Sequence, residues 1–111
     1  MDRAAFELLV ADALRALPAW AGAALVNVAV IVAEEDPDEP DLYGLYDGVA
    51  LPDRDGVEPY EPARILVFRR PLVSDFPSRR ELREEVRVTV LHEIAHHFGL
   101  DEDRLDDLGF S

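Results

Sequence analysis

Residues 78–99, with the sequence SRRELREEVRVTVLHEIAHHFG, form the most strongly patterned stretch of the chain. Ser78 is followed three residues later by Glu81, which is the capping-box signature of a helix start. Apolar residues then recur at three- and four-residue spacing, as they do along one face of a helix. Gly99 stands where a helix C-terminal cap belongs. The stretch therefore predicts one long helix that begins at Ser78 and ends before Gly99.

The segments before this helix predict another helix and three strands. Residues 2–17 carry apolar side chains at helical spacing, and Pro18 is expected to end that helix. Residues 25–33 are rich in β-branched side chains and predict a central strand that is largely buried on both faces. Shorter strands are expected at residues 42–46 and 64–69.

The connections between these elements predict the fold class. Pro71 is expected to end the third strand, and the connection from Arg69 to Ser78 is too short to hold a crossover helix. The long helix should therefore pack back across the sheet. A last short helix is expected from about Asp101. The 111 residues suffice for one core. We expect a single α+β domain over residues 1–111, in which a small mixed or antiparallel sheet packs against the N-terminal helix and the long helix.

Charge limits the partners that the chain can have. It carries 24 Asp and Glu residues against 11 basic residues, all of them Arg, for a formal net charge of -13. A field of this sign repels phosphate groups, so neither nucleic acid nor an anionic membrane surface is expected as a partner. The acidic run at residues 34–41 contains two prolines and is predicted to be a solvated loop.

Composition also limits the cofactors and the cellular location. The chain has no cysteine, so only His, Asp and Glu remain as metal ligands. The N-terminal residues lack the pattern of a signal peptide, and no apolar stretch reaches the roughly 18 residues that a membrane helix needs. A cytoplasmic protein is expected.

All three histidines of the chain lie within six positions of the long helix. His92 and His96 are four residues apart, so their imidazoles lie on one helix face and can bind one metal ion. Glu93 is placed to accept a proton from a metal-activated water without being a ligand. His97 should face the other side of the helix, where it packs or supports the ligands from behind, and ligation by His97 is the less favoured alternative. In the competing interpretation, the histidines only complete a polar seam, but such groups on an apolar helix are costly without a cation or hydrogen-bond partners.

A third ligand is needed, because zinc normally takes three protein ligands and leaves a fourth position to water. Gly99 can turn the chain back under the histidines, and the residues that follow are acidic. We expect Glu102 to be the third ligand, with Asp101 and Asp103 as alternatives. An exposed acid in the first turn of the last helix is nearly as good an interpretation of Glu102.

With Glu102 the motif reads HExxHxxGxxE, which resembles the zincin metallopeptidase motif. The chain resembles still more closely the small bacterial zincin-like family described as minimal metalloproteases, and this resemblance covers most of its length. It implies a zincin-like fold and zinc-dependent hydrolysis of a peptide or protein substrate. His92, His96 and a residue after Gly99 would hold Zn²⁺, and Glu93 would act as general base. A strand edge at residues 64–69 or 42–46 would hold the substrate as an added strand.

Two features of the chain depart from the related metzincin pattern. Glu102 stands where metzincins have His or Asp, and the only methionine is Met1, so the methionine turn of metzincins cannot form. These departures keep open an alternative in which the chain is a catalytically weak or inactive zincin-fold binding or regulatory module. Tyr43, Tyr46 and Tyr60 could in principle donate a hydrogen bond to an oxyanion, although packing is the more usual role of tyrosine.

Overall fold

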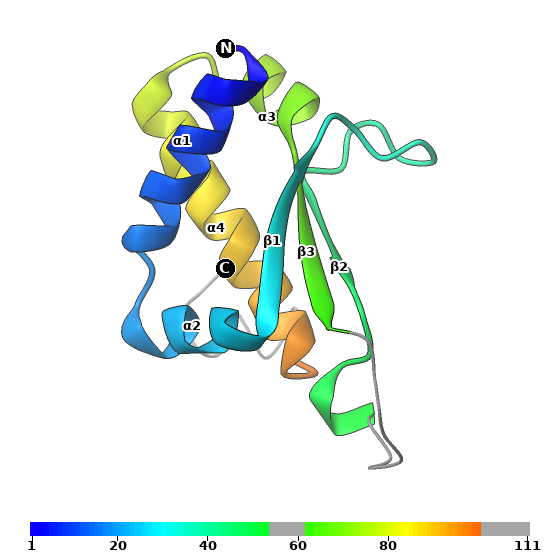
Figure 1. Cartoon of the computed structure of the whole chain (residues 1–111). Coiled ribbons are helices and arrows are strands. Elements are labelled where there is room, and N and C mark those ends of the chain that lie inside the picture. The colour runs from blue at the N-terminus through cyan, green and yellow to red at the C-terminus, as the bar shows by residue number, and fades with distance from the viewer. Residues whose placement is uncertain (54–61, 101–111) are drawn as a thin grey trace.

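The computed structural model describes residues 1–53 and 62–100 of the chain (Figure 1). Three strands, β1 (Val28–Ala33), β2 (Gly44–Asp47) and β3 (Ala63–Phe68), form one sheet in the order β1-β3-β2. The described helices are α1 (Arg3–Arg15), α2 (Ala19–Ala24), α3 (Arg69–Asp75) and α4 (Arg79–His97). Short 3₁₀ turns occupy Leu25–Asn27 and Leu51–Asp53.

The N-terminal helix forms where the sequence predicts it. The Asp2 carboxylate accepts a hydrogen bond from the Ala5 N–H at 2.8 Å and so caps the start of α1. The helix ends at Arg15, slightly before the predicted end. Pro18 lies directly before a second helix, α2, which the sequence patterns did not indicate. Its six residues, rich in Ala, have no apolar periodicity long enough to be recognised.

The prediction of a central strand at residues 25–33, largely buried on both faces, is wrong in three respects. The first three residues form a 3₁₀ turn, and β1 lies at an edge of the sheet. Its alternate residues Ala29 and Ile31 are exposed, because the helices cover only one face of the sheet (Figure 1). β-branched composition identifies a strand, but it does not say how many of the strand's faces are covered.

The central strand is β3, which pairs with β1 in parallel and with β2 antiparallel, so the sheet is mixed as expected. Pro71 does not end this strand as predicted. It lies in the first turn of α3, where a proline is tolerated because the N–H groups there have no acceptor within the helix. The connection to α4 thus holds a short helix, although this helix does not cross between strands.

The long helix α4 is capped at both ends as predicted. The Ser78 hydroxyl accepts a hydrogen bond from the Glu81 N–H at its start. At its end Gly99 has a φ of 77°, and the N–H groups of Gly99 and Leu100 donate to the carbonyls of His96 and Ala95, both at 2.9 Å. These two bonds are a Schellman motif, which needs glycine at its left-handed position.

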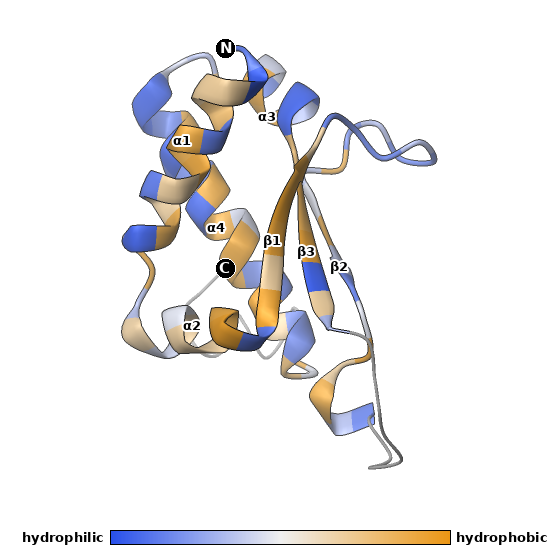
Figure 2. Ribbon diagram, viewed as in Figure 1, coloured by the Kyte–Doolittle hydropathy of each residue, from blue (hydrophilic) through white to orange (hydrophobic). Residues whose placement is uncertain are grey.

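The core lies between the sheet and the helices α1 and α4, which contact each other. Figure 2 shows β1 as mostly hydrophobic, whereas hydrophobic and hydrophilic residues alternate along α1. The α+β class and the packing of α4 across the sheet are confirmed. The largest fully buried side chains include Phe6, Leu9, Ile65, Phe68, Leu72, Leu82 and Ile94.

No single helix within the described residues has the length and hydropathy to cross a membrane. The segments Arg3–Arg15 and Ala19–Asn27 pass such a test only as a pair, across a bend of 117°.

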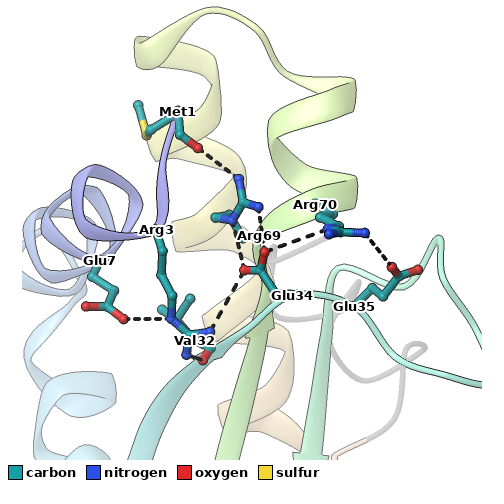
Figure 3. Close-up of polar contacts among 8 residues, drawn as sticks. All are labelled: Met1, Arg3, Glu7, Val32, Glu34, Glu35, Arg69 and Arg70. Atoms are coloured by element: carbon teal, nitrogen blue, oxygen red, sulfur yellow. Dashed lines mark hydrogen bonds and ion pairs between the residues drawn. The ribbon is translucent and has the colours of Figure 1, made fainter.

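The acidic run after β1 is a loop, as predicted, but its first residue is not simply solvated. The Arg69 guanidinium donates to both oxygens of Glu34, at 2.8 and 2.5 Å, and Arg3 and Arg70 lie within 3.9 Å of the same carboxylate (Figure 3). Arg69 also donates to the Met1 carbonyl at 2.9 Å. This Glu34 cluster, made of Glu34 and the three arginines, joins the ends of β1 and β3 to the start of α1.

Replacing Glu34 by Gln should lower the melting temperature at neutral pH by a few degrees. The hydrogen bond from Arg69 holds the pKa of Glu34 below its usual value. The charge of Glu34 therefore stabilises the fold above the unfolded-state pKa, and this contribution is lost as the pH falls through the lower folded-state pKa. Thermal unfolding at several pH values should show the gap between wild type and E34Q closing in acid.

Glu35→Gln is the matched control, because Glu35 pairs only with the exposed Arg70 among the described residues, at 3.2 Å. Equal melting temperatures for E34Q, E35Q and wild type at neutral pH would contradict a stabilising role of the Glu34 cluster.

Candidate metal centre

The last two turns of α4 carry the candidate ligands. His92 and His96 lie one turn apart on the same face of the helix and are both partly exposed. Glu93, in contrast, is only 8% exposed. The helix forms here because the apolar residues around the motif pack into the core, among them Val90, Leu91 and Ile94.

Glu93 and His96 are joined directly. Oε1 of Glu93 lies 2.9 Å from Nδ1 of His96. A carboxylate on Nδ1 favours the tautomer that carries its hydrogen there, which leaves Nε2 of His96 as the nitrogen with a lone pair. The second oxygen of Glu93 is not used in this contact.

The strand β2 runs beside this part of the helix, and its backbone comes close to the helix at Gly44. A Cβ atom on Gly44 would stand 2.5 Å from Cγ2 of Thr89, 3.2 Å from the Leu66 carbonyl oxygen and 3.6 Å from Cγ of Glu93. Only glycine fits there. The strand backbone is thereby brought against the side chain of Glu93.

His97 faces away from the two candidate ligands, as expected. It is 4% exposed, and its Nδ1 lies 2.7 Å from the hydroxyl oxygen of Tyr46 on β2. The two rings are 5.6 Å apart, and the Tyr46 hydroxyl also donates to the Val49 carbonyl at 3.3 Å. The hydroxyl of Tyr46 is therefore engaged with the body of the protein.

The other tyrosines have different places. The Tyr43 hydroxyl donates to Asp75 at 2.5 Å, and this hydrogen bond, with burial and the charges of Asp75, Glu85 and Asp41, raises the pKa of Tyr43 to about 12. Tyr43 thus ties the start of β2 to α3. Tyr60 lies outside the described residues.

The predicted third ligand is not among the described residues. Glu102 and its alternatives Asp101 and Asp103 follow the end of the described chain, as does the predicted last helix. Within residues 1–53 and 62–100, no three His, Asp or Glu side chains lie close enough to hold a metal ion together. The described residues thus offer two imidazoles, whose chemistry suits zinc, and a carboxylate next to them.

Gly44 and Thr89 are parts of the site that the sequence patterns did not single out. A signal for Gly44 was present, because a glycine inside a strand pattern often marks a close approach of another segment. No comparable signal pointed to Thr89, whose spacing is that of an ordinary core-facing residue.

A helix that carries HExxH is the element on which metalloproteases of this motif bind their zinc. The family model for zincin-like metallopeptidases matches residues 25–110. The chain therefore belongs to the zincin-like metallopeptidase family, and the resemblance seen in the sequence is confirmed. No curated protein matches the chain.

Substituting Ala for Gly44 should destabilise the fold by about 1–3 kcal/mol, the usual cost of overpacking. The added methyl group would meet Cγ2 of Thr89. Thr89→Ser removes that methyl group and keeps the hydroxyl, so the double variant should recover part of the lost stability. Chemical denaturation of the four proteins measures the coupling. A double variant no more stable than G44A would contradict the assigned contact.

Proposed function

We propose that the chain hydrolyses peptide bonds in a zinc-dependent reaction. The observation that carries the proposal is the geometry of α4, where His92 and His96 share a face and the Glu93 carboxylate lies 2.9 Å from Nδ1 of His96. Membership of the zincin-like metallopeptidase family supports the same activity.

In this proposal His92 and His96 hold the metal. When bound, zinc supplies Lewis-acid chemistry, because it acidifies a water molecule and polarises a carbonyl group. Glu93 accepts the water proton on the carboxylate oxygen that His96 leaves unused, and it later passes the proton to the leaving amine. The low exposure of Glu93 keeps bulk water away from this transfer.

Glu102 is the proposed third ligand, with Asp101 and Asp103 as the alternatives. The Schellman motif at Gly99 supports this choice, because it turns the chain sharply just before the three acids.

The substrate is proposed to be a peptide or protein segment that lies along the outer edge of β2. Of the two edges expected from the sequence, that of residues 64–69 is wrong, because β3 is paired on both sides. Phe68 N–H donates to the Tyr43 carbonyl, so in an antiparallel ladder the N–H and C=O of Gly44 point away from β3. An added strand at this edge would run beside Glu93.

Glu93→Gln should lower kcat/KM at least about 100-fold, the low end for the loss of a general base. The amide oxygen of Gln can still accept a hydrogen bond from His96, so the zinc content should stay the same. Elemental analysis and a peptide-library assay of both proteins measure the two quantities.

The alternative of an inactive binding or regulatory module makes a different prediction for the same pair of proteins. A wild type that takes up zinc and cleaves nothing in the library would overturn the proposed hydrolysis. A stable partner retained equally by wild type and Glu93→Ala would then favour the binding module.

Glu102→Gln should weaken zinc binding by at least about tenfold, a loss that even outer-shell partners of metal ligands can cause. Asp101→Asn and Asp103→Asn are the matched controls and should change the zinc affinity little. Competition with a chromophoric chelator measures all three. A loss confined to one of the aspartate variants would move the ligand to that residue.

A further inference from the structure

We propose that Tyr46 and His97 are positioning residues, whose contact sets β2 in fixed register along the zinc-binding helix. The inference rests on the proposed function, because β2 is the strand that would hold the peptide. It assigns a role to two residues that neither bind the metal nor transfer a proton in that proposal.

The contact joins two elements that share no backbone hydrogen bonds. Tyr46 lies on β2, and His97 is the last residue of α4 (Figure 1). Nδ1 of His97 and the Tyr46 hydroxyl oxygen are 2.7 Å apart, and His97 is 4% exposed. This hydrogen bond is partly buried and directional, so it ties the strand to the helix in one geometry.

A second contact between β2 and α4 lies one helix turn before the first. Gly44 precedes Tyr46 by two residues on β2, and it sits against Glu93, which precedes His97 by four residues on α4. Two strand residues span about 6.7 Å and four helix residues about 6 Å, so the two contacts have matching spacing. They hold the strand alongside the last turn of the helix at two points.

The glycine contact alone does not fix this register. A glycine presents only backbone to Thr89 and Glu93, so this contact has no direction of its own, and the ladder with β3 ties β2 to the sheet and not to the helix. The Tyr46 to His97 hydrogen bond is directional and resists sliding. His97 directly follows His96 in the chain. The hydrogen bond to His97 therefore fixes the position of β2 relative to the helix turn that carries the proposed metal ligand His96.

The consequence for catalysis follows from the proposed peptide position. If β2 moves, a peptide bound to its edge moves with it, while His92, Glu93 and His96 stay on α4. A misplacement of about 1 Å can lower the rate of a bound substrate 100-fold. Peptide binding to the strand and zinc binding to the helix would be unaffected, so the defect should appear in kcat.

The first test is Tyr46→Phe, which removes only the hydroxyl group. Its kcat for a cleaved peptide should fall about tenfold, as expected for a small misalignment, with KM and zinc affinity within about twofold of wild type. Tyr43→Phe is the comparison variant, because it removes a hydroxyl that ties the start of β2 to α3 through Asp75 and leaves the contacts of β2 with α4 in place. It should leave kcat and KM unchanged.

His97 provides a second pair of variants. Asn can place an amide nitrogen near the position of Nδ1 and should retain most of the kcat, whereas Leu cannot bond to Tyr46 and should behave like Y46F. A wild-type kcat for Y46F, or equal kcat values for H97N and H97L, would overturn the positioning role while leaving the proposed hydrolysis intact.

A measurement that does not need activity separates the two proposals. Amide hydrogen exchange in β2 should be at least about tenfold faster in Y46F than in wild type, while α1 exchanges at the same rate in both. If wild type cleaves nothing, this result still supports the fixed register and only the hydrolysis is overturned. Equal exchange in β2 would overturn the positioning role.

Discussion

The arrangement of the candidate site depends on how closely β2 approaches α4. At Gly44 the strand backbone lies where any side chain would collide with Thr89. This approach brings an edge of the sheet to the side chain of Glu93, while His92 and His96 stay partly exposed. A bulkier residue at position 44 would push the strand away from Glu93 and from the turn that carries the two candidate ligands. The absence of one side chain is therefore as important to the site as the presence of the histidines.

The two ends of α4 serve different purposes. Its start is fixed by the Ser78 cap, and its middle is buried against α1 and the sheet, so the helix is a rigid support. Its end is fixed by the Schellman motif at Gly99, where a Cβ atom would also stand 2.6 Å from Pro52. The chain therefore leaves the helix in one direction, directly after the two candidate ligands. A ligand contributed by the following acidic residues would benefit from this fixed exit.

Much of the architecture could be predicted from local patterns. The caps, the helical spacing and the HExxH residues of α4 are local features of one continuous stretch of sequence. The helix, and the side of it on which His97 lies, could therefore be predicted. The position of β1 was predicted wrongly, because Val and Ile enrichment reports a strand and not its neighbours. The pairing of Tyr46 with His97 joins residues 51 positions apart in the chain, and no local pattern encodes such a contact.

The Glu34 cluster is a second set of contacts, here between charged residues, that local sequence patterns do not predict. Glu34 begins a run of acids that resembles an ordinary solvated loop, and only the fold brings Arg3 and Arg69 to it. The third ligand is a different case. Glu102, the residue predicted for this role, lies outside the described residues, so the third ligand stays a prediction from the sequence.

One hydrogen bond of Arg3 affects an edge of the sheet. Its guanidinium donates to the carbonyl of Val32, on the edge strand β1. An exposed strand edge can recruit strands from other molecules, which is a common origin of aggregation, and a charged side chain at such an edge discourages it. Arg3 thus occupies a carbonyl with which an incoming strand would pair. The two edges of the sheet differ in this respect: the β1 edge carries the Arg3 side chain, whereas along the β2 edge, beside the histidines, no further strand pairs within residues 1–53 and 62–100.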